Sequence, residues 1–188
     1  MKSHAEDEFR AFVEDRRTAL VRTAYLLCGD RDEAEDLAQV TLTKTYTSWA
    51  RVASVENPDA YVRRILVNTN LSRVRRRRVT HFLTDRLPER AGPDSTGAVA
   101  QRSVLMAALA RLPAGQRAAV VLRYWEDRPE SEVAQILGCA VGTVRSQTFK
   151  GLARLRQDPQ LTDLIPHQTE TPSTSNTEVR QWPTTAPH

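Results

Sequence analysis

The chain contains 188 residues, of which 40% are hydrophobic and 27% are charged, and its formal net charge at pH 7 is +4. This length predicts one or two small domains. Its polar, acidic start is unlike a secretion signal, and no apolar run reaches the roughly 20 residues that span a membrane. We therefore expect a protein that works in the cytoplasm without a membrane partner.

Three amphipathic helices are predicted in the first part of the chain. The first ends at Gly29, and Asp30 is placed to cap the second, whose first turn is acidic. Residues 51–56 are predicted to form a loop. An asparagine followed by Pro58 marks the start of the third helix, because proline suits the first helical position. Three such helices can share one core, so residues 1–80 are expected to form the first domain.

The rest of the chain is predicted to contain a linker, a second domain and a tail. Proline and glycine punctuate residues 81–97, which suits a flexible linker. Shorter helical patterns follow in residues 98–157. Residues 158–188 are rich in Pro, Thr and Ser, cannot bury enough surface to offset their ordering entropy, and are expected to be disordered. No strand alternation is convincing, so the predicted fold is all-α: two small helical domains joined by a flexible linker, the second containing a helix-turn-helix.

Basic charge is concentrated outside the tail. Residues 158–188 hold four acidic residues and one basic residue, so the remainder holds 26 basic and 19 acidic ones. Nearly all of these bases are arginine, which suits bidentate contacts with phosphate and guanine. A GC-rich genome that favours arginine codons is the simpler explanation for much of this excess.

The arginines are densest in residues 61–79, where seven arginines occur without an acid. Such a helix is expected to bind a polyanion, with strongly salt-dependent affinity. Asn68 and Ser72 lie one helical turn apart, with Arg64 and Arg75 nearby. The alternative interpretation is a solvated charged face on which the Asn68 amide bonds only water.

The clearest motif is SEVAQILGCAVGTVRSQTFKGLARLR, residues 131–156. A short apolar helix, a turn at residues 138–140 and a longer basic helix form a helix-turn-helix pattern. Side chains on the outer face of the second helix are long or polar enough to reach base edges and phosphates. They are Thr143, Arg145, Ser146, Gln147, Phe149 and Lys150. An ordinary helical hairpin is the alternative, but turn, periodicity and charge together favour contact with DNA.

The second helix, residues 34–49, has an acidic surface backed by apolar residues. This surface matches DNA poorly and suits a protein partner with basic side chains. A solvated acidic face is the simpler alternative.

No pattern of catalysis or metal binding is present. Cys28 and Cys139 are far apart, and the four histidines are scattered. Free thiols are expected rather than a disulfide. The sequence contains no GxSxG, Walker loop or HExxH motif. We therefore expect neither an enzyme nor a requirement for a metal or another cofactor.

Taken together, residues 9–156 resemble an extracytoplasmic-function (ECF) RNA polymerase sigma factor of the SigE-like actinobacterial branch. Residues 29–49 are similar to the opening of region 2, whose helix docks on the β′ clamp helices. Residues 57–78 are similar to the promoter-melting segment. Residues 109–127 and the following helix-turn-helix are similar to region 4, which reads the upstream promoter element.

The resemblance implies roles for individual residues. The expected polymerase-docking residues are Asp36, Leu37 and Gln39. Residues expected at the single strand of the minus-ten element are Arg64, Asn68, Ser72, Arg75 and Arg76. The loop of residues 51–58 is expected to pocket a flipped base. Residues expected to face the minus-thirty-five element are Thr143, Arg145, Ser146, Phe149 and Lys150. The implied partners are core RNA polymerase (β′ clamp helices and β flap), promoter DNA and, as often in ECF relatives, an anti-sigma factor.

Three positions depart from the family pattern. Val40 stands where the docking motif commonly has Glu, which alters or weakens one polymerase contact. Ala140 replaces a frequent capping Ser, a loss of about 1 kcal/mol that Thr143 is expected to offset in part. Phe149 is unusually large and apolar for the outer face. It is expected to contact a thymine methyl group or an inhibitory partner.

The implied function is to direct core polymerase to promoters and to trap unstacked bases of the non-template strand. The flexible linker lets one chain span both promoter elements. The alternative is a helix-turn-helix regulator that is not a polymerase subunit, and a third class is a non-specific basic nucleic-acid binder. A repressor needs neither the acidic helix nor an arginine-rich helix with asparagine, so the N-terminal half favours the sigma factor.

Overall fold

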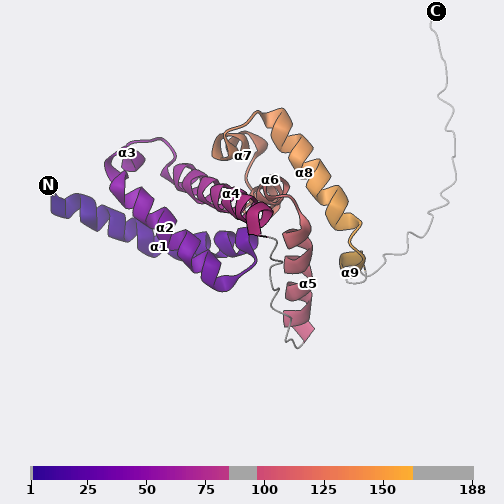
Figure 1. The fold of residues 1–188 in the computed structure, drawn as a ribbon. Coiled ribbons are helices and arrows are strands. Elements are labelled where there is room, and N and C mark those ends of the chain that lie inside the picture. Colours follow the sequence, from indigo (N-terminus) through magenta and orange to yellow (C-terminus); the bar gives the residue numbers. More distant parts are fainter. Residues whose placement is uncertain (1, 85–96, 163–188) are drawn as a thin grey trace, which may run out of the picture.

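The computed structural model describes residues 2–84 and 97–162. We call these two ranges the first half and the second half. Every regular element in them is a helix, which confirms the predicted all-α fold class (Figure 1). None of the described helices is long and apolar enough to cross a membrane.

The first half folds into α1 (Lys2–Cys28), α2 (Arg31–Thr47), α3 (Trp49–Ala53) and α4 (Pro58–Thr84). Two helix starts are capped as the sequence predicts. The Asp30 side chain accepts a hydrogen bond from the Glu33 backbone N–H at 2.9 Å, and Asn57 accepts one from the Ala60 N–H at 2.9 Å. These caps satisfy donors that a helix start leaves without an intrahelical partner.

The second half contains α5 (Gly97–Arg111), α6 (Ala114–Val120), the π-helical turn η1 (Val121–Trp125), α7 (Glu130–Leu137), α8 (Val141–Arg156) and α9 (Pro159–Thr162). Gly138 ends α7 with φ of 65°, as the predicted helix-turn-helix requires. Gly151 permits close packing of α8 on α6, because a Cβ there would lie 2.7 Å from Val120 Cγ2.

Three element boundaries differ from the prediction. The predicted loop of residues 51–56 begins as α3, because Val52 is fully buried in the core and holds this turn against it. α4 continues to Thr84, past the predicted start of the linker, and no proline or glycine interrupts it there. The predicted tail begins as α9, anchored by the buried Asp158, which pairs with Arg111. The remainder of the predicted linker and tail lies outside the described residues.

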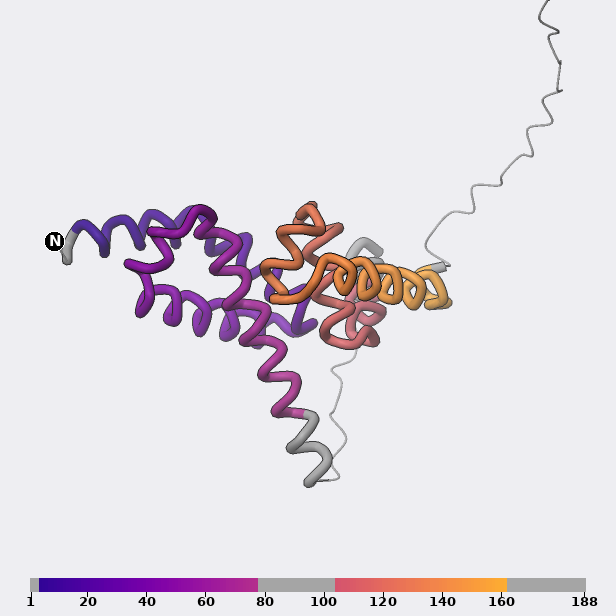
Figure 2. Tube along the Cα trace, turned by 90° about the horizontal axis from the view of Figure 1, so that it is seen from above, coloured from indigo at the N-terminus to yellow at the C-terminus, as the bar shows by residue number. Residues whose placement is uncertain are grey.

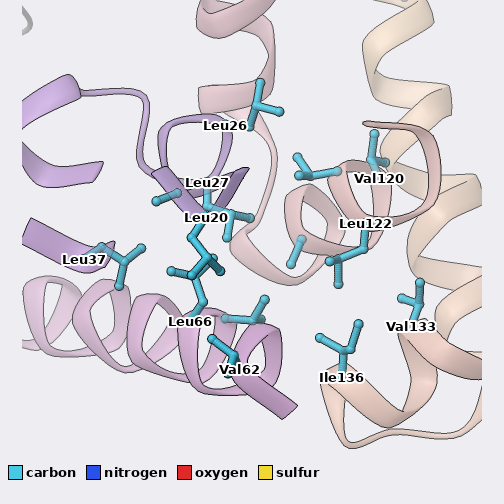
Figure 3. Packing of buried hydrophobic residues seen from close by; sticks show 14 of the residues in the cluster. Leu20, Leu26, Leu27, Leu37, Val62, Leu66, Val120, Leu122, Val133 and Ile136 are labelled. Carbon is cyan, nitrogen blue, oxygen red and sulfur yellow. The ribbon is translucent and has the colours of Figure 1, made fainter. Parts of the chain in front are cut away.

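The two halves pack on each other. α1 contacts α5, α6 and η1, and α4 contacts α6 and α7. One cluster of buried hydrophobic side chains continues from the first half into the second, from Leu20, Leu27 and Leu66 to Leu122 and Ile136 (Figure 3). α6 and α7 lie between α4 and α8 in Figure 1, and α8 extends away from the first half in Figure 2.

Candidate nucleic-acid interface

α4 carries one exposed polar face. Arg64, Asn68, Ser72 and Arg75 follow one another at steps of four, four and three residues, and all four are exposed. Such steps keep side chains on one side of a helix, here along about 16 Å. Arg76 is exposed beside them. We call these five residues the α4 stripe. The structure thus gathers on one surface every residue that was predicted to contact the single strand.

The other arginines of this run face different partners. Arg63 is 6% exposed and forms ion pairs with Asp59 and Glu126. Arg73 Nη2 lies 2.6 Å from Asp36 Oδ2, and Arg77 Nη1 lies 2.8 Å from a Glu33 carboxylate oxygen. The prediction that the whole run neutralises phosphates is therefore wrong for the buried Arg63. Arg73 and Arg77 serve first as counterions of α2.

Burial and charge oppose each other around Arg63. Burial lowers the pKa of Arg63, but the hydrogen bond that Arg63 donates to Asp59 and the charge of Glu126 outweigh it and raise the pKa above its ordinary value. Burial likewise raises the pKa of Asp59, but Arg63 and Arg128 outweigh it, and the pKa lies below its ordinary value. Both groups are therefore held in their charged forms.

An aromatic ring lies at the start of the stripe. Tyr61 is half-buried, and the Arg51 guanidinium lies 5.9 Å from the centre of its ring. Tyr61 is not among the residues that the sequence predicts at the single strand. Its spacing of three and seven residues from Arg64 and Asn68 was the signal that it borders the same face. Tyr61 also lies against the predicted base-pocketing loop of residues 51–58, through Arg51.

The predicted polymerase-docking residues divide between surface and core. The Asp36 side chain is 64% exposed, and Gln39 is exposed one turn further on. Leu37 is fully buried and points into the hydrophobic core, as Figure 3 shows. The assignment of Leu37 to the docking surface is therefore wrong for this structure. One helical step of about 100° separates it from Asp36 and turns it inward.

The second helix of the helix-turn-helix, α8, exposes every residue that was expected to face the minus-thirty-five element. All five predicted DNA-facing residues are exposed: Thr143, Arg145, Ser146, Phe149 and Lys150. Val144 and Thr148 are buried and fix the helix against the rest of the second half. Arg145 Nε lies 2.7 Å from Glu130 Oε2 in an exposed ion pair. Exposed pairs contribute at most about 1 kcal/mol, so this pair can be exchanged for a DNA phosphate.

The start of α8 lacks a side-chain cap. Ala140 occupies the capping position, with φ of −70° and ψ of 151°, and no side-chain hydrogen bond caps this end. The Thr143 N–H bonds to the Ala140 carbonyl at 2.9 Å, but Thr143 does not replace the missing cap. Within the described ranges, no group of three or more ligating side chains could hold a metal ion.

The fold and these surfaces define a class of protein: a helical DNA-binding factor with a helix-turn-helix and a separate basic, asparagine-bearing helix. Comparison with known families makes this class specific. Residues 12–80 match the family Sigma-70 region 2, and residues 102–155 match Sigma-70, region 4. Both matched ranges are thus parts of sigma factors.

Individual relatives agree with these family matches. The chain is 40% identical to the RNA polymerase sigma-E factor of Streptomyces avermitilis over 84% of this chain and 88% of the relative. It is 30% identical to the ECF RNA polymerase sigma factor SigL of Mycobacterium tuberculosis over 78% of this chain and 86% of that one.

Solved structures show the same fold. The sigma factor RpoE from Bartonella quintana, in complex with the anti-sigma factor NepR, has a TM-score of 0.69 and 28% identity, and covers 82% of this chain and 97% of its own. CnrH, in complex with the cytosolic domain of CnrY, is 21% identical with a TM-score of 0.58, over 85% of this chain and 90% of its own, and supports the fold alone.

The chain therefore belongs to the ECF RNA polymerase sigma factors, and it is similar to the sigma-E factors of Streptomyces. Its function is that of a sigma factor, which directs core RNA polymerase to promoters at the start of transcription. The region 2 match decides against the alternative of a helix-turn-helix regulator that is not a polymerase subunit.

Proposed function

We propose that the α4 stripe holds the unstacked non-template strand of the minus-ten element. The observation that carries this proposal is the placement of all five stripe residues on one exposed face. The exposed arginines suit phosphates. Asn68 offers both a donor and an acceptor, which is what reading a base edge requires.

Melting requires compensation for lost base stacking, which costs a few kcal/mol per step. Tyr61 can supply a stacking surface at the start of the stripe, and base–aromatic stacking contributes about 1–3 kcal/mol per base. Arg51, which lies over the same ring, would hold the phosphate of a base that enters the neighbouring loop.

In the second half, α8 would enter the major groove of the minus-thirty-five element. Thr143, Arg145 and Ser146 lie at its N-terminal part, the part of a recognition helix that contacts base edges. Lys150 suits a phosphate, and the 71% exposed Phe149 suits a thymine methyl group. Together these residues would anchor the chain upstream on duplex DNA.

In the first half, Asp36 and Gln39 on α2 would dock on basic side chains of the polymerase clamp. In this proposal residues 1–80 and 98–157 act as two units with different binding partners, and residues 81–97 join them. The protein is an initiation factor, so the polymerase performs the chemistry, and its place of action is the cytoplasm. The solved structure of RpoE from Bartonella quintana is a complex with an anti-sigma factor, so we also propose an anti-sigma factor as a partner.

In vitro transcription with purified core polymerase tests this function. Added protein should produce defined starts from a genomic promoter library, and polymerase alone should not. Absence of a start at any promoter would contradict the sigma activity itself. A start that persists unchanged when Arg64 and Asn68 are both replaced by alanine would refute the role of the stripe.

A further inference from the structure

A small polar cavity lies where α1, α2 and α4 of the first half meet α5 and α6 of the second. Its volume is about 170 Å³. A cavity of about 150 Å³ suffices for a ligand the size of benzene, so a phosphate or sulfate ion fits here. The polar side chains that line the cavity are Cys28, Glu33, Asn70, Arg73, Arg77 and Arg117.

The lining of this cavity carries more positive than negative charge. Three arginines line it, and Glu33 is the one carboxylate among the described residues that do so. Glu33 pairs with Arg77, with 2.8 Å between Nη1 and a carboxylate oxygen. Arg73 pairs with Asp36, which is not part of the lining. Arg117 is therefore the lining cation that has no carboxylate partner among the described residues.

Arg117 is buried, and its charge is only partly satisfied. It is 6% exposed, and its Nε donates to the Leu26 carbonyl at 2.5 Å, in the last turn of α1. Its Nη2 has no hydrogen-bond partner among the described residues. Burial lowers the pKa of Arg117 to about 10, so the guanidinium still carries its charge at neutral pH. Since a buried charge without a counterion is unfavourable, an anion beside this guanidinium would stabilise the structure.

The neighbours of Arg117 are neutral groups that leave room for an oxyanion. Asn70 is 4% exposed, and its Oδ1 accepts a hydrogen bond from the Cys28 thiol, so its Nδ2 remains as a donor. Burial and the nearby Glu33 raise the pKa of Cys28 from 9.0 to about 11, so this thiol adds no negative charge at neutral pH. A Cβ at Gly29 would lie 3.3 Å from Arg117 Nη2, so the glycine keeps a side chain away from the guanidinium.

We propose that this cavity binds a phosphate-sized oxyanion through the Arg117 guanidinium and the Asn70 amide. Arg73 and Arg77, with side chains that are 27% and 60% exposed, would attract the anion from solvent. A guanidinium suits this ligand because its parallel N–H groups can bind two phosphate oxygens at once. Pockets for drug-sized ligands begin at roughly 300 Å³, so a free phosphate ion or the phosphate group of a small metabolite enters, and a whole nucleotide does not.

This site goes beyond the proposed function, because it requires neither DNA nor polymerase. Arg117 belongs to α6 and Asn70 to α4, so the bound ion would link two helices from different halves of the chain. A ligand that binds only the folded protein also raises its stability as the ligand concentration rises. Failure of promoter-dependent transcription would refute the proposed function and leave the anion site intact.

Isothermal titration calorimetry of the full chain with sodium phosphate tests the site, at constant ionic strength so that screening does not vary. Arg117→Met removes the buried charge and keeps an unbranched side chain. Arg17→Met is the control, because it makes the same charge change at an exposed position of α1, roughly 16 Å along the helix from Cys28. Arg77→Gln changes a side chain that is 60% exposed, so it keeps the test decisive if Arg117→Met does not fold.

We expect saturable binding of phosphate, with equal affinity, in the parent and in Arg17→Met. Arg117→Met should weaken binding by about tenfold or more, since a hydrogen bond between charged groups is lost. Arg77→Gln should weaken it by about threefold, because this side chain is largely exposed. Absence of saturable binding in the parent would overturn the site. A loss of affinity in Arg77→Gln but not in folded Arg117→Met would place the anion outside the cavity and would also overturn it.

A parallel titration with glycerol phosphate identifies the source of the phosphate group. Tighter binding of this ester than of inorganic phosphate would assign the site to a phosphorylated metabolite. Tighter binding of inorganic phosphate would assign it to the free ion. Both results require the same dependence on Arg117, because the two ligands share the group that the cavity holds.

Discussion

Arg73 Nη2 lies 2.6 Å from Asp36 Oδ2, so an arginine of the basic helix α4 is the counterion of an acid on α2. A neighbouring arginine of the same run, Arg75, is exposed on the stripe. Two arginines that are two positions apart in the sequence therefore have different tasks.

This difference predicts different salt dependences. Arg75→Gln should lower the slope of log affinity against log salt by about 1, because one phosphate contact is lost. Arg73→Gln should leave the slope unchanged and cost less than about 1 kcal/mol of stability, since the pair is largely exposed. Fluorescence anisotropy of the holoenzyme on promoter DNA over a range of KCl measures both slopes. If Arg73→Gln lowers the slope as much as Arg75→Gln does, the ion pair with Asp36 does not prevent Arg73 from contacting DNA.

Asn68 and Asn70 form a second contrast. Asn68 is exposed, whereas Asn70 is 4% exposed and its Oδ1 accepts a hydrogen bond from the Cys28 thiol at 3.7 Å. A base contact contributes about 1–3 kcal/mol, so Asn68→Ala should reduce open-complex formation at least about fivefold with little change in core binding. Asn70→Ala should instead lower the free energy of unfolding by about 1–3 kcal/mol.

Permanganate reactivity of unpaired thymines measures melting, and urea titration measures stability. If Asn68→Ala weakens core binding and melting to the same extent, Asn68 supports the fold and does not read the strand.

Glycine positions in α8 predict stability changes of opposite sign. A Cβ at Gly151 would meet Val120 Cγ2 at 2.7 Å, so Gly151→Ala should overpack the contact with α6 and cost about 1–3 kcal/mol. Nothing lies within 4 Å of a Cβ at Gly142, so Gly142→Ala should gain up to about 1 kcal/mol from helix propensity. Urea unfolding of both variants tests this, and a loss of stability in Gly142→Ala would count against the described start of α8.

The missing cap of α8 can be restored. Ala140 already has the extended backbone of a capping residue, so Ala140→Ser should add about 1 kcal/mol to the free energy of unfolding. Ala140→Val is the control, because it has a side chain of similar reach without an acceptor. Identical unfolding midpoints for the two variants would mean that water already satisfies the free backbone N–H groups at this helix start.

Asp59 predicts a specific response to acid. Its pKa lies below the ordinary value of 3.8 because Arg63 and Arg128 outweigh its burial. The stabilisation is therefore complete above about pH 3.8 and is lost as the pH falls through the lower, folded-state pKa. Asp59→Asn should cost about 1.5–3 kcal/mol at neutral pH and flatten the acid limb of the stability curve.

Stability curves from pH 7 to pH 2 make this measurement. Asp15→Asn is the control, since the Asp15 side chain is 70% exposed and pairs with its neighbour Arg16. If Arg63 and Arg128 do not stabilise the charged form of Asp59, the stability curves of the two variants should differ only by a constant over the whole pH range.

Local chemistry explains what the sequence predicted well. The caps at Asp30 and Asn57 and the left-handed Gly138 depend on a few adjacent residues, and all three are present. The exposed face of α8 follows from helical periodicity alone.

Contacts between distant parts of the chain explain what the sequence could not predict. Arg63 and Arg64 are adjacent, but one helical step sends the first toward Glu126, 63 residues later, and the second to solvent. Leu37 belongs to a motif of docking residues, yet its phase on α2 places it in the core. No local sequence pattern predicts which residue of a distant helix will pair with a given arginine. Charge density alone therefore assigned too many arginines of α4 to phosphate binding.

The contact between Gly29 and Arg117 has a consequence for how such proteins can be recombined. The space that one position leaves is filled by the other, which lies in the opposite half. A chimera that takes its second half from a relative therefore pairs an inherited glycine with an unfamiliar side chain. Suppressor genetics should show that a shorter residue at 117 relieves only part of the defect from a bulkier residue at 29, because the φ of 89° at Gly29 strains any other residue there.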